Sequence, residues 1–294
     1  MMLLLTLIAF PLPVEGTEGF HAIELVPFGE GVAATGEAGS RLLVLGGGLE
    51  PLLDITAGDL GIDWFRSIAA DPLLGDLWVL AEDTGPFLFR FDRGTLTDAD
   101  GFRFDDISNP VVDGSGRLWY SSGGRLFRDL ADLGIVLDAG WLAVSADGET
   151  VAWVDGEDRV WRTRVSSDLE PEMVEERRSI TPFYLPTSPV LVVPLLGGGF
   201  SMHLPEGSVI EVEEGLQPSW CPYPEGVVYC VSEDDGHRII GSDLYLATLQ
   251  GEIVRLTDTP DCLETNPSVF DEGIIAVDAS NGYLVVVPDD CLFR

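Results

Sequence analysis

The chain has 294 residues, of which 50 are acidic and 16 are basic, so its formal net charge is −34. All the basic residues are arginines, and a chain this negative repels polyphosphates and anionic bilayers, which argues against nucleic-acid binding. Hydrophobic residues make up 46% of the chain. This apolar content is enough to build a core and excludes a disordered polymer.

The first 16 residues are predicted to be a signal peptide. Residues 2–10 form an apolar run that is too short to span a bilayer, and small residues follow before Thr17. No basic residue precedes Arg41, so the usual positive start is missing, and a buried first strand is the alternative. No later stretch of 18 apolar residues predicts a membrane span. We therefore expect an exported protein, periplasmic or secreted.

The cysteines lie in the last quarter of the chain, at Cys221, Cys230, Cys262 and Cys291. A Pro-Glu-Gly turn between the first two predicts neighbouring antiparallel strands, and hence a Cys221–Cys230 disulfide. Cys262 would then pair with Cys291. Both bonds need an oxidising compartment, which agrees with export.

A repeat of about 40 residues organises the rest of the chain, residues 20–294, as one domain. Each unit contains an apolar strand, a Gly/Asp turn, a second strand, a polar turn and a third strand. Residues at one equivalent position of the second strands are Ala34, Trp78, Trp119, Trp153, Val193, Tyr229 and Ala276. Their spacings are 44, 41, 34, 40, 36 and 47 residues.

Units of this length are four-stranded antiparallel meanders that close into a ring, because a single meander cannot bury both of its faces. The fold class is therefore all-β, a single β-propeller of seven blades, or of six if the irregular fifth unit at residues 187–215 is not a blade. Residues 167–178 are the one candidate helix, and a polar fourth strand is the alternative there.

Two stretches, residues 145–162 and 218–260, resemble the TolB-type, WD-like β-propeller repeat. The positions that match its pattern are Asp147, Gly148, Ala152, Trp153, Trp220, Asp235, Gly236, Tyr245, Leu256, Thr257 and Pro267. The α/β domain that precedes the propeller in TolB has no counterpart between the predicted leader and Phe20. The resemblance implies a propeller and says little about activity.

Acidic residues recur in the turns between second and third strands, which lie on one rim of a propeller. We take Glu82, Asp83, Asp155, Asp158, Asp234 and Asp235 as candidate binding residues on that rim. The plain alternative is that they are solvated turn residues. No cofactor is predicted. Asp98 and Asp100 resemble half of a calcium loop that lacks its first acidic ligand, so Ca²⁺ at these two residues is the alternative.

Tryptophans fall into two groups. Trp78, Trp119 and Trp153 occupy equivalent repeat positions and are expected to pack between blades. Trp64, Trp141 and Trp220 lie near first strands, where a ligand could reach them, but core packing is the expectation for these as well. The pair Arg177–Arg178 follows two glutamates and is expected to form local ion pairs rather than an anion site.

The leading hypothesis for function is a non-catalytic, exported, monomeric propeller whose loops bind a protein partner in the cell envelope. Residues 111–130 are similar to gluconolactonase-type propellers, which implies the alternative of a metal-dependent hydrolase with carboxylates in the axial channel. No Gly-x-Ser-x-Gly elbow, Walker loop or His-Glu-x-x-His motif occurs.

Overall fold

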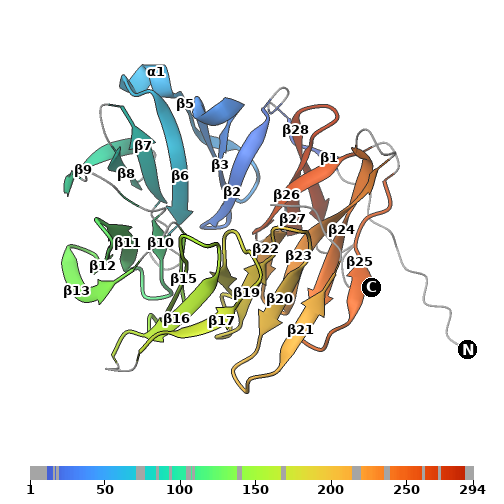
Figure 1. Cartoon of the computed structure of the whole chain (residues 1–294). Helices are drawn as coiled ribbons and strands as arrows, with labels where there is room; N and C mark the ends of the chain where they lie inside the picture. Colours follow the sequence, from blue (N-terminus) through green and yellow to red (C-terminus); the bar gives the residue numbers. More distant parts are fainter. Residues whose placement is uncertain are drawn as a thin grey trace, which may run out of the picture.

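A computed structural model describes residues 12–15, 17, 20–70, 77–83, 86–92, 95–103, 107, 110–137, 141–166, 170–213, 220–234, 239–259, 262–270 and 273–288. Its strands form seven four-stranded antiparallel sheets arranged as a ring of blades (Figure 1). The predicted all-β propeller with seven blades is therefore confirmed, and the irregular fifth unit is a blade.

Consecutive strands build each blade from the ring's centre outwards, and blades 1 to 4 span the first part of the chain. Blade 1 contains β2 (Ala22–Phe28), β3 (Gly31–Gly36), β4 (Arg41–Leu45) and β5 (Pro51–Thr56). Blade 2 contains β6 (Trp64–Ala70), β7 (Leu77–Glu82), β8 (Pro86–Asp92) and β9 (Thr95–Arg103). Blade 3 contains β10 (Val111–Val112), β11 (Leu118–Ser122), β12 (Arg125–Arg128) and β13 (Ala131–Val136). Blade 4 contains β14 (Leu142–Val144), β15 (Thr150–Val154), β16 (Val160–Arg164) and β17 (Glu172–Glu175).

Blades 5 to 7 complete the ring. Blade 5 contains β18 (Phe183–Tyr184), β19 (Leu191–Pro194), β20 (Phe200–His203) and β21 (Val209–Val212). Blade 6 contains β22 (Trp220–Tyr223), β23 (Gly226–Asp234), β24 (Ile239–Thr248) and β25 (Ile253–Arg255). Blade 7 contains β26 (Glu264–Phe270), β27 (Gly273–Asp278), β28 (Tyr283–Pro288) and β1 (Leu12–Pro13). The described helical turns are α1 (Ala57–Leu60) and the 3₁₀ turn η1 (Glu37–Gly39).

Apolar side chains pack in the seams between neighbouring blades. Second strands such as β3 and β27 are buried along their whole length, because alternate residues face the blade on either side. In β3, Ala33 packs toward blade 2 and Ala34 toward blade 7. Trp119 and Trp153 pack in the seam of blades 3 and 4, and Trp78 packs in the seam of blades 2 and 3, as predicted.

The N-terminal strand closes the ring. Within blade 7, β1 is the outermost strand, and Leu12 lies opposite Val286 of β28. The Thr17 hydroxyl extends this contact by accepting a hydrogen bond of 3.0 Å from the backbone N–H of Leu284. The leader predicted over residues 1–16 thus includes β1, and its cleavage, which stays a prediction, would remove the closing strand.

The cysteines occupy a different register from the predicted one. Cys221 lies opposite Val228 in the β22–β23 ladder, while Cys230 lies two residues further along β23. Diagonal neighbours of this kind are about 7–8 Å apart, at the limit of disulfide geometry. No disulfide joins the cysteines of the described chain, and Cys291 lies outside it. The predicted pairing is therefore not shown.

The region of the candidate helix also differs from the expectation. Glu172–Glu175 forms β17, the fourth strand of blade 4, so the alternative of a polar strand is right there. Residues 167–169 lie outside the described chain. A strand is favoured because β17 pairs with β16 and so completes the blade.

Candidate functional site

All the turns that carry the predicted rim acids lie at one end of the ring. Inner strands begin, second strands end and third strands begin at this end, because successive strands of each blade are antiparallel. We call this end the leading face. Loops on a rigid scaffold are common binding surfaces, so the leading face is the first place to look for a site.

Asp155, the first of the rim acids, is used within its own turn. Its carboxylate accepts hydrogen bonds of 2.8 Å from Arg159 Nε and 2.7 Å from Trp161 Nε1. Burial would raise its pKa, but these bonds and those from two backbone N–H groups hold the pKa of Asp155 at about 2. Asp155 is therefore an ionised turn residue whose charge Arg159 largely neutralises.

The other rim acids are divided between blades. Asp158 shares the turn of Asp155 and binds Arg178 Nε at 2.8 Å. On blade 2, Glu82 is 3.5 Å from Arg66 Nη1, and Asp83 beside it is exposed. The side chain of Asp234, in β23, and the whole of Asp235 lie outside the described chain. The structure thus brings Asp155 and Asp158 together and places Glu82 and Asp83 elsewhere on the same face.

Trp64 is the most exposed aromatic side chain of the leading face described here. It begins β6, lies opposite Glu82 and is 48% exposed. The blade 1 turn packs closely against it at Gly39, where an added Cβ would lie 2.7 Å from the Phe65 carbonyl oxygen. Because Gly39 also has a φ of +85°, only glycine fits this position comfortably. The expectation that Trp64 belongs to the core is wrong.

Trp141 and Leu196 are exposed on the same face. Trp141 precedes β14 and is 39% exposed, while Leu196 lies in the β19–β20 turn and is 40% exposed. Backbone hydrogen bonds hold both: the Trp141 carbonyl accepts from Val154, and the Leu196 N–H donates to Arg178. Trp220, at the start of β22, is half-buried and packs beside the seam of blades 5 and 6. The expectation of core packing is therefore wrong for Trp141, whereas Trp220 does pack partly into the core.

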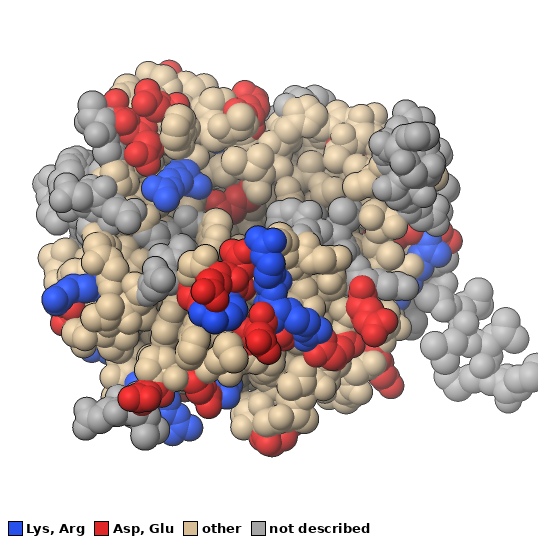
Figure 2. Space-filling view, in the orientation of Figure 1, with Lys and Arg blue, Asp and Glu red and all other residues tan. Residues whose placement is uncertain are grey.

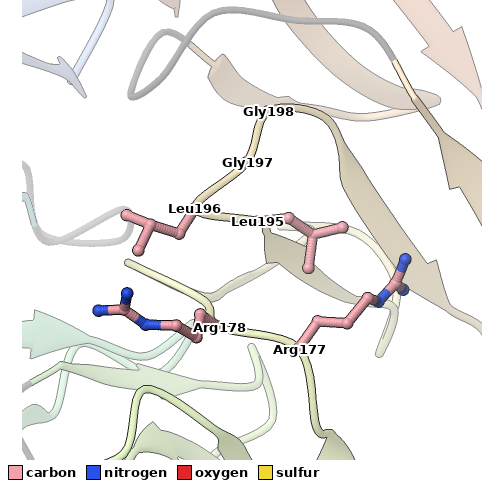
Figure 3. A pocket seen from close by; sticks show the side chains of 6 residues that line it. All are labelled: Arg177, Arg178, Leu195, Leu196, Gly197 and Gly198. Atoms are coloured by element: carbon pink, nitrogen blue, oxygen red, sulfur yellow. The ribbon is translucent and has the colours of Figure 1, made fainter.

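A surface pocket of about 470 Å³ adjoins Leu196. Its lining consists of Arg177, Arg178, Leu195, Leu196, Gly197 and Gly198 (Figure 3). The two guanidinium groups point to opposite sides, as Figure 3 shows. Arg177 binds Glu175 and Glu211, and Arg178 binds Asp158. As predicted, this pair forms ion pairs, and Figure 2 shows acidic and basic side chains gathered over blades 4 and 5.

A serine–histidine contact lies deeper in the seam of blades 4 and 5. Ser201 Oγ is 3.0 Å from His203 Nε2 and 3.4 Å from Glu175 Oε2. Burial lowers the pKa of His203, against the opposite effect of Glu175. Ser201 is 0% exposed, so no substrate reaches its hydroxyl. Sequence reasoning missed this contact, and the residues' spacing on alternate positions of β20 was the available signal.

Asp98 and Asp100 are the candidate calcium ligands. Both residues lie in β9, and their side chains are outside the described chain, so this stays a prediction. Among the residues that the structure describes, no group of three or more His, Cys, Asp or Glu side chains could hold a metal ion. Nor is any described helix long and apolar enough to cross a membrane.

Comparisons with known proteins show the fold. No family model and no curated protein sequence matches the chain, so the TolB-type resemblance is not confirmed. A catalytically inactive virginiamycin B lyase from Staphylococcus aureus, solved with Quinupristin, has a TM-score of 0.65 and 11% identity, covering 95% of this chain and 98% of that one.

Two further solved structures are similar. PorZ, a surface component of the type-IX secretion system of Porphyromonas gingivalis, has a TM-score of 0.61 and 10% identity, covering 94% of this chain and 39% of that one. A chain of the Mitotic Checkpoint Complex has a TM-score of 0.59 and 13% identity, covering 97% and 96%. At such identities the likeness establishes a seven-bladed propeller and no activity.

Proposed function

We propose that this protein is a non-catalytic, exported β-propeller of the TolB-like, WD-like kind that binds a protein partner in the cell envelope. The leading face is the docking surface. The periplasm or the extracellular space is the compartment that this proposal assigns, on the strength of the N-terminal apolar run.

The observation that carries the proposal is the exposure of large apolar side chains on one face of a rigid ring. Trp64, Trp141 and Leu196 are between 39% and 48% exposed there, although the backbone around each is held by hydrogen bonds or close packing. Tryptophan is enriched among the residues that dominate binding energy at protein interfaces. Rigid loops also lower the entropy lost on binding.

The relatives by fold are consistent with this use of a propeller. One belongs to a secretion system and another to a multiprotein checkpoint assembly, according to their descriptions. Propellers also serve as enzymes, as the lyase shows, so the fold alone does not decide.

The test is a quantitative pull-down from the native envelope fraction with the full chain as bait. We expect a double variant, Trp64→Ala with Trp141→Ala, to lose at least about tenfold of a specifically bound protein. A matched control is Leu130→Ala in the turn between β12 and β13, where the side chain is 63% exposed but lies at the opposite end of the ring, because third strands end and fourth strands begin there. Equal recovery with both variants would refute the proposal.

A further inference from the structure

A second surface pocket, of about 530 Å³, lies on blade 4. Its described lining is Trp153, Asp155, Trp161, Glu170 and Pro171. Trp153 belongs to β15 and Trp161 to β16, and the two lie directly opposite each other across that ladder. Directly opposite side chains are about 5 Å apart at Cβ, so the two indoles stand together on one face of the blade.

Both indole rings are held in place. Trp153 packs in the seam with Trp119 and Val151, and Trp161 rests against the same cluster. The Trp161 ring is also fixed by its 2.7 Å hydrogen bond to Asp155 Oδ2. The aromatic wall of the pocket is therefore preorganised, and a ligand would not have to pay for its ordering.

The charged groups of the pocket are negative. Asp155 and Glu170 supply carboxylates, and no cationic side chain is among the described lining residues. Arg159 pairs with Asp155 at 2.7 Å, while the exposed Glu170 has no ion pair with any residue that the structure describes. Aromatic faces beside carboxylates favour a cation, because the ring quadrupole and the anionic charge attract it together.

The indole rings of this protein already meet guanidinium groups, although the chain contains no lysine that could compete for them. The guanidinium carbon of Arg159 lies 5.8 Å from the Trp161 ring centroid, that of Arg128 lies 5.4 Å from Trp119, and Arg90 lies 5.8 Å from Trp78. A guanidinium is flat, stacks on indole and is more weakly hydrated than an ammonium. These properties suit a pocket with aromatic walls and a carboxylate at its rim.

We propose that the pocket formed by Trp153, Trp161, Glu170 and Pro171 receives an arginine side chain of a polypeptide partner. The aliphatic part of that side chain would lie along Trp161 and Pro171, since Trp153 is only 5% exposed and forms the floor of the pocket, with the guanidinium toward Glu170. The inference deepens the proposed function, because it rests on binding of a polypeptide and adds the chemistry of the residue recognised. Charge complementarity supports it, since the chain carries 50 acidic and 16 basic residues.

The test uses the full chain and a defined probe, the peptide acetyl-Gly-Gly-Arg-Gly-Gly-amide, titrated by calorimetry at low salt. The control peptide has citrulline, a neutral isostere, in place of arginine. We expect the arginine peptide to bind roughly tenfold more tightly, because only it brings the cation. Equal affinities, or no heat from either peptide up to ~10 mM, would overturn the inference.

Variants locate the binding. Glu170→Gln should weaken the arginine peptide roughly fivefold, and Trp161→Leu should abolish its preference over citrulline. Glu225→Gln, an exposed carboxylate on blade 6, makes the same change in charge and should leave affinity unaltered. If Glu170→Gln and Glu225→Gln weaken binding equally, the peptide is held by general attraction and the pocket is not its site.

The peptide titration and the pull-down can fail independently of each other. If the pull-down depends on Trp64 and Trp141 but the arginine peptide shows no preference, the leading face stands and this inference fails. If the peptide binds as expected while the pull-down is insensitive to the two tryptophans, the pocket stands and the leading-face proposal fails.

Discussion

Asp113 and Asp155 each organise a turn through the same four donors. Asp113 accepts from the backbone N–H groups of Ser115 and Arg117, from Arg117 Nε and from Trp119 Nε1. Asp155 accepts from the equivalent donors: the backbone N–H two residues ahead, the backbone N–H and guanidinium of the arginine four ahead, and the indole N–H of the tryptophan six ahead. The spacing Asp-x-x-x-Arg-x-Trp therefore defines the motif. The motif serves a turn between first and second strands in blade 3, and between second and third strands in blade 4.

We predict that Asp113→Ala destabilises the protein by about 2–4 kcal/mol, because the carboxylate is buried and its removal leaves several donors unpaired. The free energy of unfolding in urea is the measurement. The control Asp132→Ala removes a carboxylate that binds the exposed Arg125 and should change stability much less. Similar losses for the two variants would contradict the special role of this motif.

Glu264 introduces a dependence of stability on pH. Its side chain is 0% exposed and accepts hydrogen bonds from the hydroxyls of Thr257 and Thr259. Burial, aided by the neighbouring Asp243 and Asp278 and opposed by the hydrogen bonds from the two threonines, raises the pKa of Glu264 to about 7. The native state therefore keeps a proton that the unfolded state loses near pH 4.5.

This contribution is fully present below about pH 4.5 and is lost as the pH rises to about 7, so it amounts to about 3 kcal/mol at most. We predict that the unfolding free energy of Glu264→Gln, relative to that of the wild type, rises between pH 5 and pH 8. Urea titrations at the two pH values measure it. A difference that stays constant across this range would show that Glu264 keeps an ordinary pKa.

At the scale of elements, the short strand β1 contributes to the stability of blade 7. Val14, just after it, is buried, and its backbone N–H donates a 2.8 Å hydrogen bond to the Leu284 carbonyl. We predict that a chain starting at Thr17 has a free energy of unfolding, measured in urea, that is lower by at least about 2 kcal/mol. The loss comes from the burial of Val14 and from the outer edge of β28, which is left unpaired. Unchanged stability would mean that β1 does not close the ring.

The β22–β23 ladder makes a prediction about the cysteines. Cys221 and Cys230 are buried on one face of this ladder. We expect a maleimide reagent to leave both unlabelled in the native protein and to label both after unfolding without reductant, with mass spectrometry locating the adducts. If the unfolded chain stays unlabelled there, the two residues are oxidised and the register-based expectation is wrong.

Strand prediction succeeded where local pattern and packing agree. Ala34, Trp78, Trp119, Trp153, Val193, Tyr229 and Ala276 all lie in second strands, because a run of apolar residues between turns is buried on both faces in a propeller. Pairing of β1 with β28 joins opposite ends of the chain, and no local pattern encodes it. Likewise the two-residue difference between the predicted and the observed pairing of the cysteines depends on the turn at Pro224–Gly226, and the exposure of Trp64 depends on a neighbouring blade.

Over the whole molecule, most of the arginines whose side chains the structure describes are already engaged within the chain. Ion pairs with carboxylates involve Arg41, Arg66, Arg117, Arg125, Arg159, Arg162, Arg177, Arg178 and Arg255. The chain nevertheless has 50 acidic residues against 16 basic ones, so most carboxylates have no cation to neutralise them. The resulting potential favours the approach of cationic partners and opposes compaction of the ring.

The same excess predicts how stability responds to salt. Repulsion among like charges is screened over a Debye length of about 10 Å at 0.1 M salt and about 30 Å at 0.01 M. We therefore expect the melting temperature at pH 8 to rise by several degrees between these ionic strengths, although the individual ion pairs weaken. Sodium chloride and tetramethylammonium chloride should act equally if the effect is screening. A melting temperature that falls with salt would show that the internal ion pairs outweigh the repulsion of the surplus carboxylates.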